Sequence, residues 1–250
     1  MKRFTGKVAL VTGAGSGIGR ATCLRLGSEG ARLYGMDVDP RGLEETARLV
    51  REGGGEITTG VHDVSKRSAC GEAVAACVAA YARLDVLANV AGIVRFSHAT
   101  ETSEEEWNQV LAVNLSGPFF MSQAAIPHLL DTAGNIVNIA SNAGLMGQAY
   151  TVAYCASKAG LINMSRALAM EFVKQKIRIN CVAPAGTVTN LALSVKFPSG
   201  IEPALIDRYR GFRGMSQPDE IASVVAFIAS DEASAVHGAV WEADQAVSAG

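Results

Sequence analysis

The sequence predicts an α/β domain with a doubly wound parallel sheet. Short runs rich in β-branched residues alternate with segments of helical periodicity along the whole chain, which is typical of parallel strands joined by crossover helices. A glycine-rich turn follows the first of these runs and leads directly into a helical segment. The 250 residues contain no composition break, repeat or low-complexity tract, so a single domain over residues 1–250 is expected.

The elements are expected in strict alternation. Ser103 followed by Glu106 is a capping-box pattern that starts the fourth helix, and Ser216 with Pro218 and Asp219 predicts the start of the last one. Strands are expected at 8–12, 32–37, 57–62, 86–89, 135–140, 177–182 and 239–242. Helices are expected at 17–29, 41–52, 66–82, 104–130, 154–174 and 218–230.

One segment, at about 190–215, departs from this alternation. Insertions of this length in a compact domain are usually functional, so a substrate lid is expected; a short pair of surface helices with no role is the alternative. Its apolar residues either line a pocket or pack within the lid: Leu191, Leu193, Val195, Phe197, Ile201, Leu205, Ile206, Tyr209, Phe212 and Met215.

Composition excludes several classes of function. The 24 acidic and 22 basic side chains give a net charge of -2, which provides no positive field for nucleic acid or a membrane surface. Charged residues reach only 18%, and so little polar surface favours association with other subunits. The five cysteines include no CxxC pair and are expected to be reduced thiols of a cytoplasmic protein. The four histidines lack metal-ligand spacing, so no metal is expected.

The glycine turn predicts a dinucleotide site. Gly13, Gly17 and Gly19 fit the spacing GxxxGxG, in which side-chain-free positions and a helix N-terminus receive a pyrophosphate. Asp37 ends the second strand, where its carboxylate can bind the adenosine ribose and repel a 2′-phosphate. Ser16 offers no basic side chain and the nearest one is Arg41, so NAD is expected over NADP. The alternatives are glycines that only tighten a turn and an aspartate that only initiates one.

Tyr154 and Lys158 lie one helical turn apart and can therefore share a site. Ser141 follows the fifth strand, at the carboxyl edge where open α/β sheets bind ligands. For a phenol to act as a base near neutrality, its pKa must fall by roughly 3 from about 10, which corresponds to ~4 kcal/mol. A nearby ammonium and an oxidised nicotinamide both supply positive charge for this purpose. Surface packing and capping are the alternative roles of these residues.

These segments together resemble the short-chain dehydrogenase/reductase family over essentially the full length. The matching segments are 12–19 (TGAGSGIG), Asp63 with Val64, 89–92 (NVAG), Asn114 in AVNLSG, Ser141, Tyr154 with Lys158, and 178–184 (RINCVAP). The resemblance implies a seven-stranded Rossmann fold, a homotetramer and a small-molecule alcohol or ketone as substrate. It is closest in kind to NAD-dependent hydroxysteroid dehydrogenases, through the short stretch GLMG after Ser141.

The resemblance also implies residue roles. Ser141 would bind the substrate oxygen, Tyr154 would be the general acid/base, and Lys158 would lower its pKa and hold the nicotinamide ribose. Asn114 would anchor a water in a proton relay. Together with the glycine turn and Asp37, the expected cofactor contacts are Gly13, Ser16, Gly17, Ile18, Gly19, Asp37, Asp63, Val64, Asn89, Ala91, Gly92, Tyr154, Lys158, Pro184, Gly186, Thr187, Val188 and Thr189.

Two departures from the family pattern stand out. Ala185 separates Pro184 from Gly186 where the family has Pro-Gly, and Gln245-Ala246 replaces a glycine pair after Asp244. The apolar lid, the loop 142–148 and residues 93–96 favour an apolar or cyclic secondary alcohol, steroid-like or terpenoid-like. The alternatives are a 3-oxoacyl-thioester reductase using NADPH, a sugar or polyol dehydrogenase, and a non-catalytic dinucleotide-sensing protein.

Overall fold

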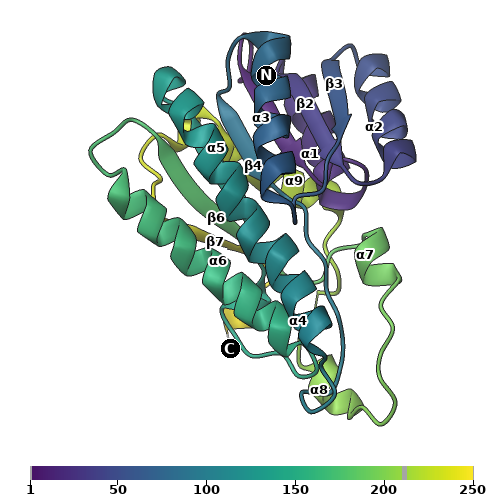
Figure 1. The fold of residues 1–250 in the computed structure, drawn as a ribbon. Helices are drawn as coiled ribbons and strands as arrows, with labels where there is room; N and C mark the ends of the chain where they lie inside the picture. Colours follow the sequence, from purple (N-terminus) through teal and green to yellow (C-terminus); the bar gives the residue numbers. More distant parts are fainter. Residues whose placement is uncertain (1, 210–212, 250) are drawn as a thin grey trace.

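Figure 1 shows the protein as a computed structural model, which describes residues 2–209 and 213–249. A parallel seven-stranded sheet runs through the centre in the order β3-β2-β1-β4-β5-β6-β7, as the sequence predicts for a doubly wound fold. The strands are β1 (Val8–Thr12), β2 (Arg32–Asp37), β3 (Glu56–Val61), β4 (Val86–Asn89), β5 (Asn135–Ile139), β6 (Arg178–Pro184) and β7 (Val240–Ala243).

Helices cover both faces of the sheet (Figure 1). Ala9 and Val11 of β1 pack in the core under α1, α2 and α9, whereas Val8 and Leu10 pack in the core under α3, α5 and α6. This alternation follows from the two-residue period of a strand. The helices are α1 (Gly17–Ser28), α2 (Pro40–Glu52), α3 (Arg67–Tyr81), α4 (Glu104–Leu111), α5 (Gly117–Thr132), α6 (Val152–Glu171), α7 (Asn190–Leu193), α8 (Pro203–Asp207) and α9 (Pro218–Ala229). None of the helices in the described part of the chain is both long and apolar enough to cross a membrane.

The helix expected at 104–130 is interrupted, which corrects the sequence prediction. A π-helical turn, Ala112–Ser116, separates α4 from α5. Asn114 in this turn is fully buried, and its side chain holds the backbone of Ile93 from both sides: Oδ1 accepts from the Ile93 N–H and Nδ2 donates to its carbonyl, each at 2.8 Å. Hydrophobic periodicity carries no signal for such a turn, because the apolar stripe continues through it.

The start of α9 is also shifted from its expected cap. Gln217 is the N-cap and forms a capping box with Glu220. Ser216 instead forms an isolated bridge with Thr187, with its N–H donating to the Gly186 carbonyl at 2.9 Å and its carbonyl accepting from Val188. The segment after β6 is thereby tied to the entry of α9.

The loops after β1 and β4 are bound to each other at the carboxyl edge of the sheet. The Thr12 hydroxyl oxygen, at the end of β1, accepts hydrogen bonds from the N–H groups of Val90 at 2.9 Å and Ala91 at 3.0 Å. Ligands of open α/β sheets bind in the crevice at this edge. The fold therefore places the glycine turn, the segment after β4 and the end of β5 around one region.

Candidate active site and cofactor cavity

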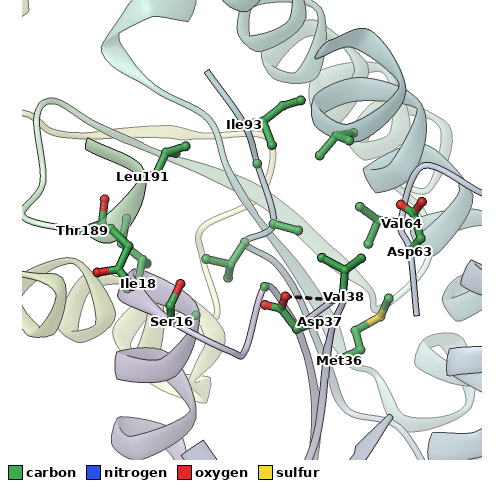
Figure 2. A pocket seen from close by; sticks show the side chains of 18 of the residues that line it. Ser16, Ile18, Met36, Asp37, Val38, Asp63, Val64, Ile93, Thr189 and Leu191 are labelled. Atoms are coloured by element: carbon green, nitrogen blue, oxygen red, sulfur yellow. Dashed lines mark hydrogen bonds between the residues drawn. The ribbon is translucent and has the colours of Figure 1, made fainter. Parts of the chain in front are cut away.

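A cavity of about 590 Å³ lies at this edge of the sheet. Figure 2 shows Ser16, Ile18 and Thr189 on one side of it, and Asp63 and Val64 on the opposite side. The loops after β1, β2, β3 and β4, the helix that carries Gln109 and the segment after β6 all contribute to it. Its lining residues are Gly13, Ser16, Gly17, Ile18, Gly19, Met36, Asp37, Val38, His62, Asp63, Val64, Ser65, Val90, Ala91, Gly92, Ile93, Gln109, Val113, Thr189, Asn190, Leu191 and Ser194.

The glycine turn has no room for side chains. Gly13 adopts φ +68°, and a Cβ built there would lie 2.9 Å from the Cα of Ala91. Gly17 adopts φ +50°, and its Cβ would meet the Thr189 side chain at 2.9 Å. Ser16 precedes α1 in an extended conformation and its side chain does not cap the helix. The first N–H groups of α1 are therefore not satisfied by this cap position, which is the arrangement suited to a phosphate.

Asp37 faces the same cavity from the end of β2. Its Oδ2 accepts from the Gly15 N–H at 2.9 Å, and its Oδ1 accepts from the N–H groups of Val38 at 2.7 Å and Asp39 at 3.0 Å; Figure 2 marks the bond to Val38. The carboxylate thus shapes a turn and also lines the cavity, so its role in the turn does not remove it from the site.

Tyr154, Lys158 and Ser141 come together, although the first two stand on α6 and the third follows β5. The Lys158 Nζ donates to the Ile139 carbonyl at 2.8 Å and lies 5.8 Å from the centre of the Tyr154 ring. Ser141 is buried, and its hydroxyl accepts from the Ala143 N–H at 3.1 Å and donates to the Asn142 Oδ1 at 3.2 Å. Helical spacing brings the phenol and the ammonium to one face.

Burial dominates the electrostatics of these groups. It lowers the pKa of Lys158 to about 8 and raises the pKa of Tyr154, against which a hydrogen bond with Ser141 acts in the lowering direction. Burial therefore outweighs the lowering effects on the phenol pKa, because the phenolate loses more hydration in this enclosed place than its neighbours restore. The role of Lys158 in depressing this pKa stays a prediction.

Gly92 joins the catalytic groups to the cavity. It lines the cavity, and a Cβ built on it would lie 3.3 Å from the Asn114 Oδ1 and 3.5 Å from the Lys158 Nζ. The buried Asn114 also donates from Nδ2 to the Ser157 hydroxyl oxygen at 3.1 Å, and Ser157 donates to the Tyr154 carbonyl at 2.7 Å. The π-helical turn is thus bound both to the wall of the cavity and to the turn of α6 that carries Tyr154.

Several expected cofactor residues lie outside the cavity lining. Asn89 is buried and donates to the Asn138 Oδ1 at 2.8 Å, so its side chain connects β4 to β5 instead. Thr187 is buried and bonded to the Ala185 carbonyl. The lining also lacks Pro184, Gly186 and Val188. Tyr154 and Lys158 do not line the cavity either, and Gly92 is the lining residue next to Lys158.

The cavity also has lining residues that the sequence did not single out. Most are sequence neighbours of predicted residues, and adjacency was the available signal for them. His62 is one: it precedes Asp63, and its Nε2 lies 3.3 Å from the Tyr34 hydroxyl. The others are Met36, Val38, Ser65, Gln109, Val113, Asn190 and Ser194.

The two residues that replace the family's glycine pair near the C-terminus adopt the left-handed backbone conformation. Gln245 adopts φ +60° and Ala246 φ +68°. The Gln245 Nε2 donates to the Ser216 hydroxyl at 3.2 Å, and Asp244 accepts from the Ala246 N–H at 3.0 Å. These contacts hold the turn in the conformation that glycines would adopt without strain.

The described residues of the segment 190–215 contact the loops that follow Ser141 and Ile93. The rings of Phe197 and Phe96 meet edge to face at 4.8 Å, and the Tyr209 hydroxyl donates to the Ala149 carbonyl at 2.8 Å. The Tyr150 hydroxyl accepts from the Glu202 N–H at 2.8 Å. Phe212 lies outside the described residues. Within the described residues, no group of three or more histidine, cysteine or acidic side chains is placed to hold a metal ion.

Comparison with known proteins agrees with this geometry. Residues 7–196 match the family model described as short chain dehydrogenase. The chain is 37% identical to a 3-oxoacyl acyl-carrier-protein reductase of Thermotoga maritima, covering 95% of this chain and 96% of that protein, and 37% identical to a D-threitol dehydrogenase of Mycolicibacterium smegmatis, covering 95% and 91%.

A short-chain dehydrogenase from Mycobacterium paratuberculosis, solved bound to NAD, superposes with a TM-score of 0.92 at 28% identity, covering 99% of this chain and 100% of that one. The family uses NAD or NADP, and its named members here act on CH–OH groups or the corresponding carbonyls. The chain therefore belongs to the short-chain dehydrogenase family and is an oxidoreductase.

Proposed function

We propose that this protein interconverts a secondary alcohol and a ketone with NAD(H), on an apolar or cyclic substrate. The observation that carries the proposal is the meeting of Ser141, Tyr154 and Lys158 next to Gly92, a lining residue of the cavity on which a built Cβ would lie 3.5 Å from the Lys158 Nζ. A dinucleotide-sensing protein without turnover would have no need of this assembly.

The cavity suits a dinucleotide. Its glycine turn leaves backbone and helix N–H groups accessible to a pyrophosphate, and Asp37 lies where an adenosine ribose would bind. A 2′-phosphate would meet the like charge of Asp37, which favours NAD over NADP. A relative solved with NAD supports the same cofactor. Asp63 and Val64 line the opposite side and would receive the adenine.

The bound cofactor supplies a hydride acceptor and, when oxidised, a positive charge beside the substrate. Ser141 would hold the substrate oxygen, and Tyr154 would take its proton as the carbonyl forms. Below about pH 8 Lys158 keeps its positive charge, which favours the phenolate that Tyr154 must become. Asn114, bonded to Ile93 and to Ser157, would keep the wall of the cavity and α6 in register for this transfer.

Two further substrate classes remain as alternatives within the family. A 3-oxoacyl-thioester reductase using NADPH is supported by the Thermotoga relative, but Asp37 disfavours that cofactor. A polyol dehydrogenase is supported by the D-threitol dehydrogenase relative, whereas the apolar lid at about 190–215 supports a less polar substrate.

We extend the proposal to the assembly of the protein, a cytoplasmic homotetramer. All five cysteines are free thiols, and apolar side chains such as Met170 and Val173 are 70% and 55% exposed in the single chain. Such exposure supports burial against further subunits. Analytical ultracentrifugation of the purified protein tests it, and a monomer at micromolar concentration would contradict it.

The central experiment is an activity screen with steroids, terpenoids, polyols and hydroxyacyl thioesters, monitored by NADH absorbance with NAD and in parallel with NADP. Reduction of NAD by secondary alcohols is expected. NAD binding without reduction by any member would favour the sensor, and equal or higher kcat/KM with NADP would overturn the cofactor assignment.

A further inference from the structure

Two carboxamides connect the two sides of the candidate active site. The Asn142 Oδ1 accepts from the Ser141 hydroxyl at 3.2 Å and from the Gln148 Nε2 at 3.1 Å. Gln148 is held at its backbone by α6: its N–H donates to the Cys155 Sγ at 3.4 Å, and its carbonyl accepts from the Thr151 hydroxyl at 3.0 Å. Cys155 is the neighbour of Tyr154. Gln148 is therefore tied to Ser141 through Asn142 and to the turn of α6 that carries the phenol.

The hydrogen bonds between these two carboxamides and their neighbours do not use all of their donors and acceptors. Asn142 is only 2% exposed, and its Nδ2 is buried with no hydrogen-bond partner among the described residues. An unpaired buried donor costs about 1–3 kcal/mol, so such a group in a native site calls for a ligand or a water. Gln148 is partly buried, and its bond to Asn142 uses one of the two N–H donors of a group that also carries an acceptor oxygen.

Apolar residues flank this pair in the sequence and occur in the lid. Leu145 and Met146 lie between the two carboxamides in sequence, and the lid packs Phe197 against Phe96. In an apolar pocket, a few placed polar groups fix the orientation of the ligand. A polar pair adjoining the position of the reacting oxygen can bind another polar atom of the substrate there.

We propose that the Asn142–Gln148 pair selects substrates that carry a second oxygen on the carbon next to the reacting carbinol, namely vicinal diols and the matching hydroxyketones. The inference rests on the proposed function, because it places the reacting oxygen between Ser141 and Tyr154. A vicinal oxygen lies within hydrogen-bond reach of a group next to the first one, and a carboxamide can donate to a carbonyl or accept from a hydroxyl.

The test compares substrates that differ by one hydroxyl: cyclohexane-1,2-diol with cyclohexanol, and butane-2,3-diol with butan-2-ol, each with NAD. Wild-type protein is expected to show at least about tenfold higher kcat/KM for the diol of each pair, since one neutral hydrogen bond corresponds to roughly that factor. Gln148→Met keeps the length of the side chain and removes its polar atoms. It is expected to lose the diol preference, so that kcat/KM falls by about tenfold more for the diol than for the mono-alcohol of each pair.

Gln123→Met is the matched control, because Gln123 lies on α5 and bonds the exposed Arg67 instead of the site. It is expected to keep the wild-type ratio. If Gln148→Met lowers kcat/KM equally for both members of each pair, or leaves the ratio unchanged, Gln148 only supports its loop and the inference is overturned. Wild-type protein that oxidises the mono-alcohols without preferring the diols overturns this inference alone; protein that oxidises neither overturns the proposed function as well.

Discussion

The ammonium of Lys158 lies 5.8 Å from the centre of the Tyr154 ring, one turn further along α6, and both groups are displaced from their ordinary proton affinities. Burial lowers the pKa of Lys158 to about 8 and raises the pKa of Tyr154. Burial thus favours the neutral form of both groups. A phenolate at neutral pH therefore requires further positive charge, which an oxidised nicotinamide would supply.

Tyr154→Phe removes the group proposed to take the substrate proton and leaves the ring in place. Turnover is expected to fall by at least about 10³-fold, in line with the loss of a general base, while NAD affinity changes little because Tyr154 does not line the cavity. Steady-state kinetics and a fluorescence titration with NADH measure the two quantities. Activity retained above about a tenth of wild type would contradict the role.

Lys158→Met is expected to stabilise the ligand-free protein at neutral pH and to abolish activity. Below pH 8 Lys158 is protonated in both the native and the unfolded chain, so the native state carries the whole cost of burying this charge. The difference between the pKa of about 8 in the native state and the ordinary value of 10.5 corresponds to about 3 kcal/mol. Loss of the bond to the Ile139 carbonyl offsets about 1 kcal/mol of this cost, which leaves a net gain of about 2 kcal/mol.

The gain has a defined pH dependence. Between pH 8 and 10.5 the unfolded chain binds more protons at Lys158 than the native one, so the contribution of this residue to the free energy of unfolding rises with pH in the wild type. The advantage of Lys158→Met should therefore shrink as pH rises from 7 toward 10. Urea unfolding of both proteins across that range measures it, and an advantage independent of pH would show that charge burial is not its cause.

The sheet and most of the cavity could be predicted from sequence because their signals are local. β1, β2 and β4 were predicted at their observed bounds, since short runs of mostly apolar residues with adjacent turn residues mark both ends. Gly13 and Gly17 were predicted to line the site because they belong to a glycine turn after a strand, and Asp37 because it ends the next strand at the same edge of the sheet.

The remaining features depend on contacts between distant segments. The π-helical turn at Asn114 exists because that side chain binds the backbone of Ile93, which no periodicity reports. Asn89 lies outside the cavity lining for a similar reason: its amide donates to Asn138 on the neighbouring strand, and its contact with a cofactor stays a prediction. The unpaired amide of Asn142 likewise becomes visible only once its surroundings are packed.

Asp37→Asn is expected to weaken the preference for NAD by removing the charge that a 2′-phosphate would face. The amide oxygen can still accept from the Val38 and Asp39 N–H groups, whereas the Gly15 N–H loses its acceptor because an amide nitrogen takes the place of Oδ2. The ratio of kcat/KM for NAD to that for NADP should fall by about tenfold, equivalent to ~1.4 kcal/mol. Asp39→Asn is the control: Asp39 caps α2 outside the cavity lining, and its replacement should leave the ratio unchanged.

Ala246→Gly is expected to raise the free energy of unfolding by about 0.5–1 kcal/mol. Ala246 adopts φ +68°, and glycine removes the strain of a side chain in this left-handed region. This gain exceeds the loss that arises because glycine makes the unfolded chain more flexible. Ala75→Gly is the control, since Ala75 is exposed in the middle of α3, where glycine should destabilise by about 1 kcal/mol. Urea unfolding gives both values. A loss of stability in Ala246→Gly similar to that in Ala75→Gly would mean that the turn after β7 is not strained.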